Sequence, residues 1–190
     1  MKNLLLTAAF CALGTAASAV TQDFEGFNGG DDITGQDLGG FTLTAGGDIV
    51  EIVNAYDYFG TGYFIGSNPF VNDNPYRADF SVLGVNQVSV DVGDNNGDAD
   101  DLFLFAYDMF DSLIGSYTTS IADSFIGFET LTVSGANIAY VVFGGGNQLY
   151  PNSVYADNFT YSTAAVPLPA GGLLLLGALG LLGFGRRRRA

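Results

Sequence analysis

The sequence predicts an all-β fold in which two antiparallel sheets pack as a jelly-roll-like sandwich. Short runs of alternating apolar and polar residues recur along the body of the chain, separated by turns rich in Gly, Asn and Asp. No segment of the body keeps the 3.6-residue period of an amphipathic helix. Sixteen Phe and ten Tyr provide large side chains for a core between the sheets. An immunoglobulin-like sandwich is the alternative arrangement.

Ten segments of the body are expected to be strands, which is enough for two packed sheets. They are residues 41–44, 48–55, 63–65, 77–82, 85–92, 102–108, 113–119, 129–133, 138–143 and 154–161. Segment 23–27 precedes them and is also strand-like. The expected sandwich domain spans 20–161, and 162–165 form a linker to a C-terminal segment.

The residue patterns of two of these segments predict different exposure of their strand faces to water. In 85–92, valines alternate with polar residues, so one face of the strand is expected to face water. In 102–107 both faces are apolar, because Leu and Ala alternate with Phe103, Phe105 and Tyr107. We expect this strand to be central and covered on both faces. The alternative is that its aromatic face is an exposed platform on which sugar rings stack.

The charge distribution excludes nucleic acid as a partner. The chain of 190 residues has a formal net charge of −14, and most of its basic residues lie at the two ends. Between the ends, 20 acidic residues stand against the single base Arg77, a formal charge of −19. Such a surface repels nucleic acid, because each phosphate contact needs a basic side chain.

The residue types also argue against an enzyme. Histidine is absent, and the only cysteine, Cys11, lies near the N-terminus, outside the body. The commonest general base and thiol chemistry are therefore missing from the body. A small glycosidase that uses two carboxylates is the less favoured alternative, because acidic residues are abundant.

The N-terminus, residues 1–19, has the three parts of a secretory signal peptide. Lys2 supplies the charged region, residues 4–13 the short apolar region, and Ala17 and Ala19 the small-x-small cleavage site. The sequence therefore predicts that the protein is exported and that the leader is removed.

The C-terminus, residues 166–190, also has three parts. A proline-containing motif, Val166, Pro167, Leu168, Pro169 and Ala170, precedes an apolar run over 171–185, and a basic cluster of Arg186, Arg187, Arg188 and Arg189 follows it. A helix of fifteen residues spans about 22 Å, less than the roughly 30 Å of a hydrocarbon core. The arginines are expected on the cytoplasmic side. We therefore expect a short transmembrane helix that anchors the protein temporarily; the alternative is a permanent anchor of a membrane protein.

This C-terminal segment resembles the PEP-CTERM class of bacterial sorting signals, in its VPLPA-CTERM variant. The resemblance implies that an exosortase, an integral-membrane protease, recognises the motif and removes the segment. It also implies a Gram-negative source and a destination at the cell surface or in the extracellular polysaccharide matrix. The expected function is then that of an exported, non-catalytic surface or matrix protein associated with exopolysaccharide or biofilm.

Two sets of acidic residues are candidate calcium ligands. The loop between segments 85–92 and 102–108 alternates acids and amides, namely Asp94, Asn96, Asp98 and Asp100, and such oxygens suit Ca²⁺. The alternative is a solvated acidic loop. Asp157 lies on an aromatic strand face and needs a cation or a donor, and Glu25 is expected to complete its site if the first and last strands pair.

Aromatic residues between 54 and 76 are candidate sugar-binding residues. They include Tyr56, Tyr58, Tyr63 and Tyr76, and they stand among Gly, Asn and Asp. Aromatic faces beside polar groups suit sugar rings. The alternative is that these rings anchor a long loop to the core. Together with the candidate calcium ligands, the candidate sugar-binding residues indicate an alternative function, that of a carbohydrate-binding module with a structural calcium ion.

Overall fold

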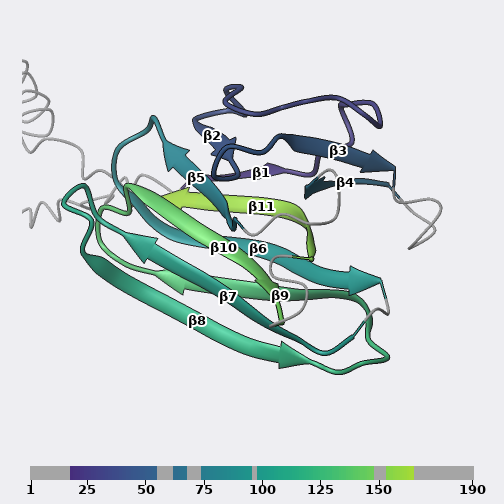
Figure 1. The fold of residues 1–190 in the computed structure, drawn as a ribbon. Coiled ribbons are helices and arrows are strands. Elements are labelled where there is room, and N and C mark those ends of the chain that lie inside the picture. Colours follow the sequence, from purple (N-terminus) through teal and green to yellow (C-terminus); the bar gives the residue numbers. More distant parts are fainter. Residues whose placement is uncertain (1–17, 55–61, 68–73, 96–97, 148–152, 165–190) are drawn as a thin grey trace, which may run out of the picture. The chain divides into compact units, whose positions relative to one another are not determined.

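The computed structural model describes residues 18–54, 62–67, 74–95, 98–147 and 153–164, and every regular element in them is a strand (Figure 1). The eleven strands are β1 (Ala19–Gln22), β2 (Phe41–Thr44), β3 (Val50–Asn54), β4 (Tyr63–Ser67), β5 (Tyr76–Phe80), β6 (Val85–Asn95), β7 (Asp100–Tyr107), β8 (Leu113–Ile121), β9 (Ile126–Ser134), β10 (Tyr140–Gly146) and β11 (Tyr155–Thr163). The all-β prediction is confirmed for this part of the chain.

The strands form two antiparallel sheets. The first sheet has the order β3-β4-β11-β6-β9, and β1 also pairs with β11. The second sheet has the order β2-β5-β10-β7-β8. Within these orders, β4-β11-β6-β9 and β5-β10-β7-β8 are the two four-stranded halves of a jelly roll, to which β1, β2 and β3 are added at the edges.

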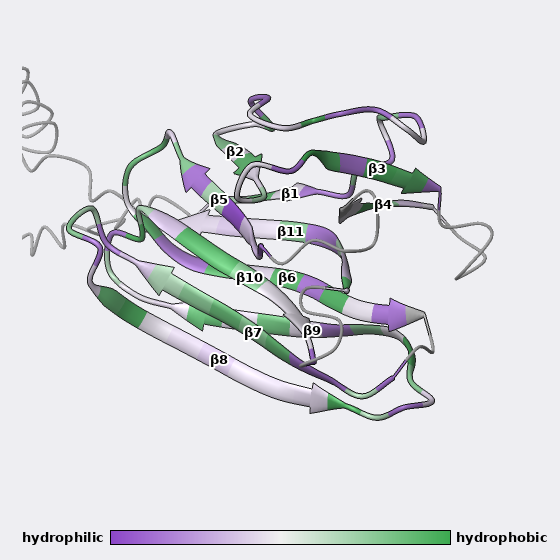
Figure 2. Cartoon of the chain, in the orientation of Figure 1, coloured by the Kyte–Doolittle hydropathy of each residue, from purple (hydrophilic) through white to green (hydrophobic). Residues whose placement is uncertain are grey.

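The core lies between the inner faces of the two sheets and is rich in aromatic rings. Phe159 of β11 stacks on Phe41 of β2, with ring centroids 4.4 Å apart, and Tyr76 lies 5.4 Å from Phe143. All four side chains are buried. Figure 2 shows green, apolar residues concentrated on β7 and β10, whereas β8 at the sheet edge is mostly pale. Alternating strands fold this way because burying one apolar face stabilises the pair of sheets.

The strand predictions succeed except near the two ends of the domain. Each of the ten expected segments overlaps one strand; the bounds of 41–44 are those expected, and the bounds of the other nine differ by a few residues. β1 was not expected, and segment 23–27 forms a turn in which the buried Phe24 has a φ of 58°. β11 continues to Thr163, so half of the expected linker belongs to the last strand.

Residues Ser18–Ala164 form one compact unit. In the residues that the structure describes, no helix has the length and hydropathy needed to cross a membrane. Most of the signal peptide and the whole segment 166–190 lie outside those residues, so their expected roles stay predictions.

Candidate functional site

Strand β7 presents a row of aromatic rings on the outer face of its sheet. Its inner face is fully buried, whereas Phe103, Phe105 and Tyr107 on the outer face are only partly buried. The expectation that this strand is covered on both faces is therefore wrong. The reason is its place in the sheet, because the other sheet packs against only one face of β7.

Tyr140 of β10 completes this row, which we call the aromatic strip: Phe103, Phe105, Tyr107 and Tyr140. The rings of Phe103 and Phe105 are stacked, with centroids 5.1 Å apart and planes at 22°. Tyr107 and Tyr140 face each other across the strands, with centroids 4.8 Å apart and planes at 11°. These ring pairs hold one another in fixed orientations, so the strip is preorganised.

A hollow of about 440 Å³ lies over one end of the strip. Phe103 and Phe105 line it together with polar residues of β7 and β8, including Asp101 and Thr118. The hydroxyl of Ser120 donates a 2.6 Å hydrogen bond to Asp101 and also lines the hollow. An apolar ring face thus meets a carboxylate and hydroxyl groups in one open depression.

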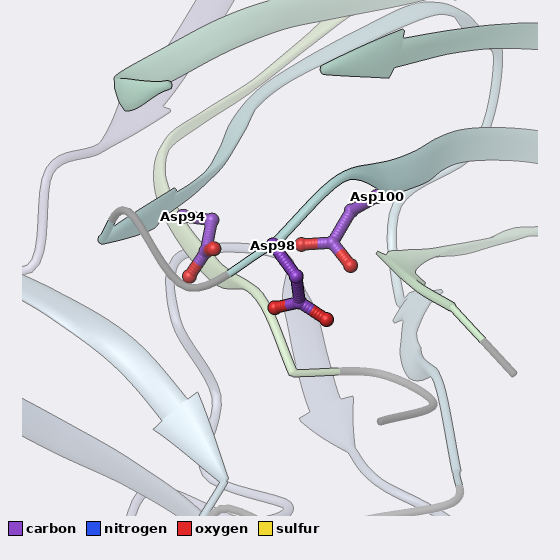
Figure 3. Close-up of side chains that lie close together, drawn as sticks. All are labelled: Asp94, Asp98 and Asp100. Carbon is purple, nitrogen blue, oxygen red and sulfur yellow. The ribbon is translucent and has the colours of Figure 1, made fainter. Parts of the chain in front are cut away.

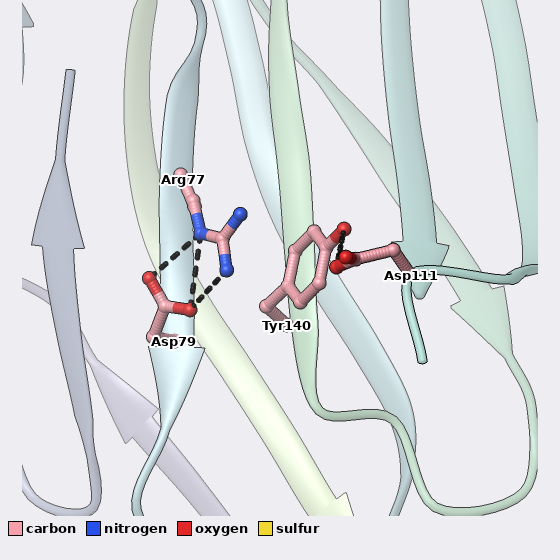
Figure 4. Close-up of polar contacts among 4 residues, drawn as sticks. All are labelled: Arg77, Asp79, Asp111 and Tyr140. Carbon is pink, nitrogen blue, oxygen red and sulfur yellow. Dashed lines mark hydrogen bonds and ion pairs between the residues drawn. The ribbon is translucent and has the colours of Figure 1, made fainter. Parts of the chain in front are cut away.

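The other end of the strip is fixed by charge (Figure 4). The guanidinium of Arg77 lies 3.6 Å above the ring centroid of Tyr140, a cation–π contact. The same guanidinium donates hydrogen bonds to Asp79 at 2.6 to 3.0 Å, which raises the pKa of Arg77. The Tyr140 hydroxyl donates to Asp111 at 2.9 Å. The charge of Arg77 is therefore already compensated by Asp79.

The predicted calcium loop brings three carboxylates together (Figure 3). Asp94, Asp98 and Asp100 each offer an oxygen, and these oxygens lie within 4.8 Å of one another. Asp94 ends the alternation that buries the valines of β6, and Asp100 begins the alternation that buries the inner residues of β7. The strand period therefore turns one carboxylate from each sheet toward the interior, where the cluster could hold a metal ion.

Asp100 is a buried carboxylate of this cluster. Its side chain is only 2% exposed, and burial, together with the charges of Asp94 and Asp98, raises its pKa to about 6. Its buried Oδ2 receives no hydrogen bond from the groups that the structure describes. The amide of Asn147 donates to Asp98 and, at 3.4 Å, to Oδ1 of Asp100. A buried carboxylate oxygen without a donor is costly, and a cation would compensate it.

Glu25 and Asp157, the other predicted calcium ligands, do not belong to the cluster of Asp94, Asp98 and Asp100. Burial, with repulsion from Asp91 and Glu25, raises the pKa of Asp157 to about 6. Glu25 accepts a 2.9 Å hydrogen bond from the backbone N–H of Tyr63. Among the described residues, only Asp94, Asp98 and Asp100 bring three carboxylates within metal-binding distance of one another.

A β-bulge places Asp157 and its neighbour Asn158 beside β6. The register of β11 against β6 shifts between Asp157 and Thr160, and Asn158 has a φ of 47°. Asn tolerates this left-handed conformation better than most residues. The Asn158 amide donates to Asp91 at 2.9 Å, and its backbone N–H donates to Asp157 at 2.7 Å. Hydrogen-bond donors of Asn158 therefore partly compensate the negative charges of Asp91 and Asp157.

The aromatic residues predicted to bind sugar have other roles where the structure describes them. Tyr76 is fully buried, and its hydroxyl lies 3.4 Å from the carbonyl oxygen of Val154, so its expected surface role is corrected to one in the core. Tyr63 is partly buried and packs against the core. Tyr56, Tyr58 and the loop residue Asn96 lie outside the described residues.

The sequence interpretation missed Tyr140, Asp101, Ser120 and Asn147. The alternation of β7 was the signal for Asp101, because this residue shares the outer face with Phe103. Ser120 lies on β8, Tyr140 lies on β10, and Asn147 follows β10. Only the pairing of β8 and β10 with β7 brings these residues to their positions.

No protein-family model matches the chain, and no curated protein matches its sequence. Among solved structures, the chain is similar to a variant of CBM29-2, a family 29 carbohydrate-binding module, at 12% identity and a TM-score of 0.42, over 78% of this chain and 93% of that chain. It is similar to the K2 cleaved adhesin domain of Lys-gingipain at 14% identity and a TM-score of 0.44, over 76% and 99%. A DUF4465 family protein from Bacteroides caccae is 12% identical with a TM-score of 0.44, over 77% and 100%.

The raised pKa of Asp157 gives a testable pH dependence. Between its ordinary value of 3.8 and about 6, the folded state binds more protons at this group than the unfolded state. The free energy of unfolding therefore falls at this group as pH rises through the window. Asp157→Asn should reduce this pH dependence of the free energy of unfolding. Urea unfolding at several pH values, with chelator present, measures it. Asp32→Asn is the control of opposite sign, because hydrogen bonds from Thr34 lower the pKa of Asp32. An unchanged profile for Asp157→Asn would contradict this assignment.

Proposed function

We propose that this domain is a non-catalytic polysaccharide-binding module of an exported surface or matrix protein. The observation that carries the proposal is the aromatic strip beside a polar-edged hollow. Sugar rings have apolar C–H faces and hydroxyl groups around their edges, so they need an aromatic face and hydrogen-bonding groups side by side. Phe103 supplies the first, and Asp101 and Ser120 supply the second.

The charge of the body favours a neutral polysaccharide. An anionic chain would be repelled by a body with 20 acids and one base. That base, Arg77, is paired with Asp79 at the strip and is not free to recruit an anion. Neutral sugars instead use Asp101 as an acceptor for their hydroxyl groups.

The hollow supports binding rather than hydrolysis. Glycosidases flank the scissile bond with two carboxyl groups. Asp101 is the one carboxylate among the described residues that line this hollow. The domain therefore holds the sugar without supplying an acid and base pair.

Truncating the strip tests the binding proposal. Phe103→Ala and Phe105→Ala should each weaken binding to a neutral polysaccharide by about tenfold, which corresponds to roughly 1.4 kcal/mol. Affinity electrophoresis against a panel of neutral and anionic polysaccharides measures the effect. Phe128→Ala is the matched control, because Phe128 is a partly buried ring that packs against Phe64 in the other sheet. Absence of binding to every polysaccharide, or equal losses in all three variants, would sink the proposal.

A structural calcium ion is a second proposal, and the buried Oδ2 of Asp100 favours it. Three carboxylates form an oxygen-rich group with no sulfur or imidazole ligand, which suits a hard cation. Ca²⁺ would link the end of β6 to the start of β7 and neutralise the charge that Asp100 places in the interior. It would stabilise only the folded state and would therefore raise the melting temperature.

Metal titration separates this proposal from a solvated acidic loop. The melting temperature should rise with millimolar CaCl₂ and return with chelator, because binding at a hundred times Kd adds about 2.7 kcal/mol. Asp100→Asn should remove the response while leaving the chelated domain at least as stable, since a buried charge is lost. Asp32→Asn should keep the response. A chain that melts identically with CaCl₂ and with chelator has no such site.

We also propose that the C-terminal segment is an exosortase sorting signal and that the domain reaches the cell surface or its polysaccharide matrix. The motif at 166–170, the short apolar run and the arginine cluster support this proposal. A polysaccharide-binding domain suits such a destination, because the matrix offers its ligand at high local concentration.

Substitution of the motif prolines tests the sorting proposal in cells. Pro167→Ala with Pro169→Ala should leave the unprocessed chain in the membrane fraction, because proline restricts the backbone angle φ and alanine does not. Immunoblotting of membrane and extracellular fractions gives the readout. Pro75→Ala, inside the domain, should be processed normally. Normal release of the double variant would refute the proposed role of the motif.

A further inference from the structure

One end of the sandwich exposes three large apolar side chains. Leu83 is 93% exposed in the turn between β5 and β6, and Met109 and Phe110 are 76% and 78% exposed in the turn between β7 and β8. These turns lie at the end of the domain where β5 and β7 finish (Figure 1). Single exposed apolar residues are common on proteins, but three that border one groove indicate a contact surface.

A groove of about 560 Å³ runs between these turns. Leu83, Met109 and Phe110 line it together with Val82 and Ile138, so its walls are largely apolar. We call this region the exit end, defined by Val82, Leu83, Met109, Phe110 and Ile138.

The described chain leaves the domain at this same end. The backbone N–H of Ala164 donates a 2.8 Å hydrogen bond to the carbonyl of Gly84, and Gly84 itself lines the groove. Six residues, 165–170, then precede the apolar run that begins at Gly171. Fully extended, they reach at most about 22 Å. Any surface that the apolar run enters is therefore within reach of the exit end.

We propose that the exit end rests on the lipid bilayer while the C-terminal segment is intact, with Leu83, Met109 and Phe110 in the interfacial region. The inference rests on the proposed membrane anchoring of 171–185. Apolar side chains on loops bind a bilayer by entering the boundary between headgroups and acyl chains. The contact is weak by itself, and the short tether supplies the high effective concentration that it needs.

The charges near the exit end favour a zwitterionic bilayer over an anionic one. Asp108 accepts hydrogen bonds from the backbone N–H groups of Phe110 and Ser112, which lowers its pKa and keeps it ionised. The only basic side chain of the described domain, Arg77, is paired with Asp79 in the second sheet. Anionic lipid would therefore meet negative charge without a compensating base.

A tryptophan introduced at the exit end reports on this contact, because the natural chain contains no Trp. The chain with residues 165–190 intact is reconstituted in phosphatidylcholine vesicles, with and without brominated acyl chains that quench Trp. Phe110→Trp and Leu83→Trp should show blue-shifted emission and a clear loss of intensity with brominated lipid. Ile126→Trp is the matched control, because Ile126 is 60% exposed and pairs with Asn95 at the opposite end of the domain. Its emission should not respond.

The outcomes separate this inference from the anchoring on which it rests. Flotation of the chain with the vesicles, but equal quenching for Phe110→Trp and Ile126→Trp, overturns the bilayer contact and leaves the anchor intact. Failure to float overturns both. Blue-shifted emission from Phe110→Trp without any bromine quenching also overturns the contact, and it would show that protein covers the groove instead.

Discussion

The two-residue period of strand β7 is the constraint on which the functional surfaces of this domain depend. Successive side chains of a strand point to opposite faces, so each residue of β7 belongs either to the core or to the outer surface. The inner set begins with the buried Asp100 and continues through fully buried aliphatic residues. The outer set begins with Asp101 and continues through Phe103, Phe105 and Tyr107, three of the four rings of the aromatic strip. A shift of one residue would exchange the two sets and remove both sites.

The same period explains why a polar cluster is found in a core position. Where β6 and β7 approach the end of the sandwich, their inward positions hold Asp94 and Asp100 instead of apolar residues. Burial without sufficient donors raises the pKa of Asp100, so this end of the domain carries an electrostatic cost in the absence of a cation. Asn147 offsets part of this cost by joining the end of β10 to the loop.

The domain separates its surfaces along the strands. The carboxylate cluster lies at the end where β6 finishes and β7 begins, and the exit end lies where β7 finishes and β8 begins. The aromatic strip runs along β7 between them. A polysaccharide on the strip would therefore leave both the proposed cation site and the proposed membrane-facing turns accessible. Such separation suits a protein that is anchored first and binds its ligand afterwards.

The sequence by itself determined the all-β class, ten of the eleven strands and the acidic loop, because alternation and turn residues act over short distances. It did not reveal β1, because this strand is only four residues long and is stabilised by pairing with β11 across nearly the whole domain. Only the tertiary structure decided that Tyr76 is a core residue and that the outer rings of β7 are open to solvent. Both depend on which strands pair and on which sheet face the second sheet covers, and these long-range contacts leave no local pattern in the chain.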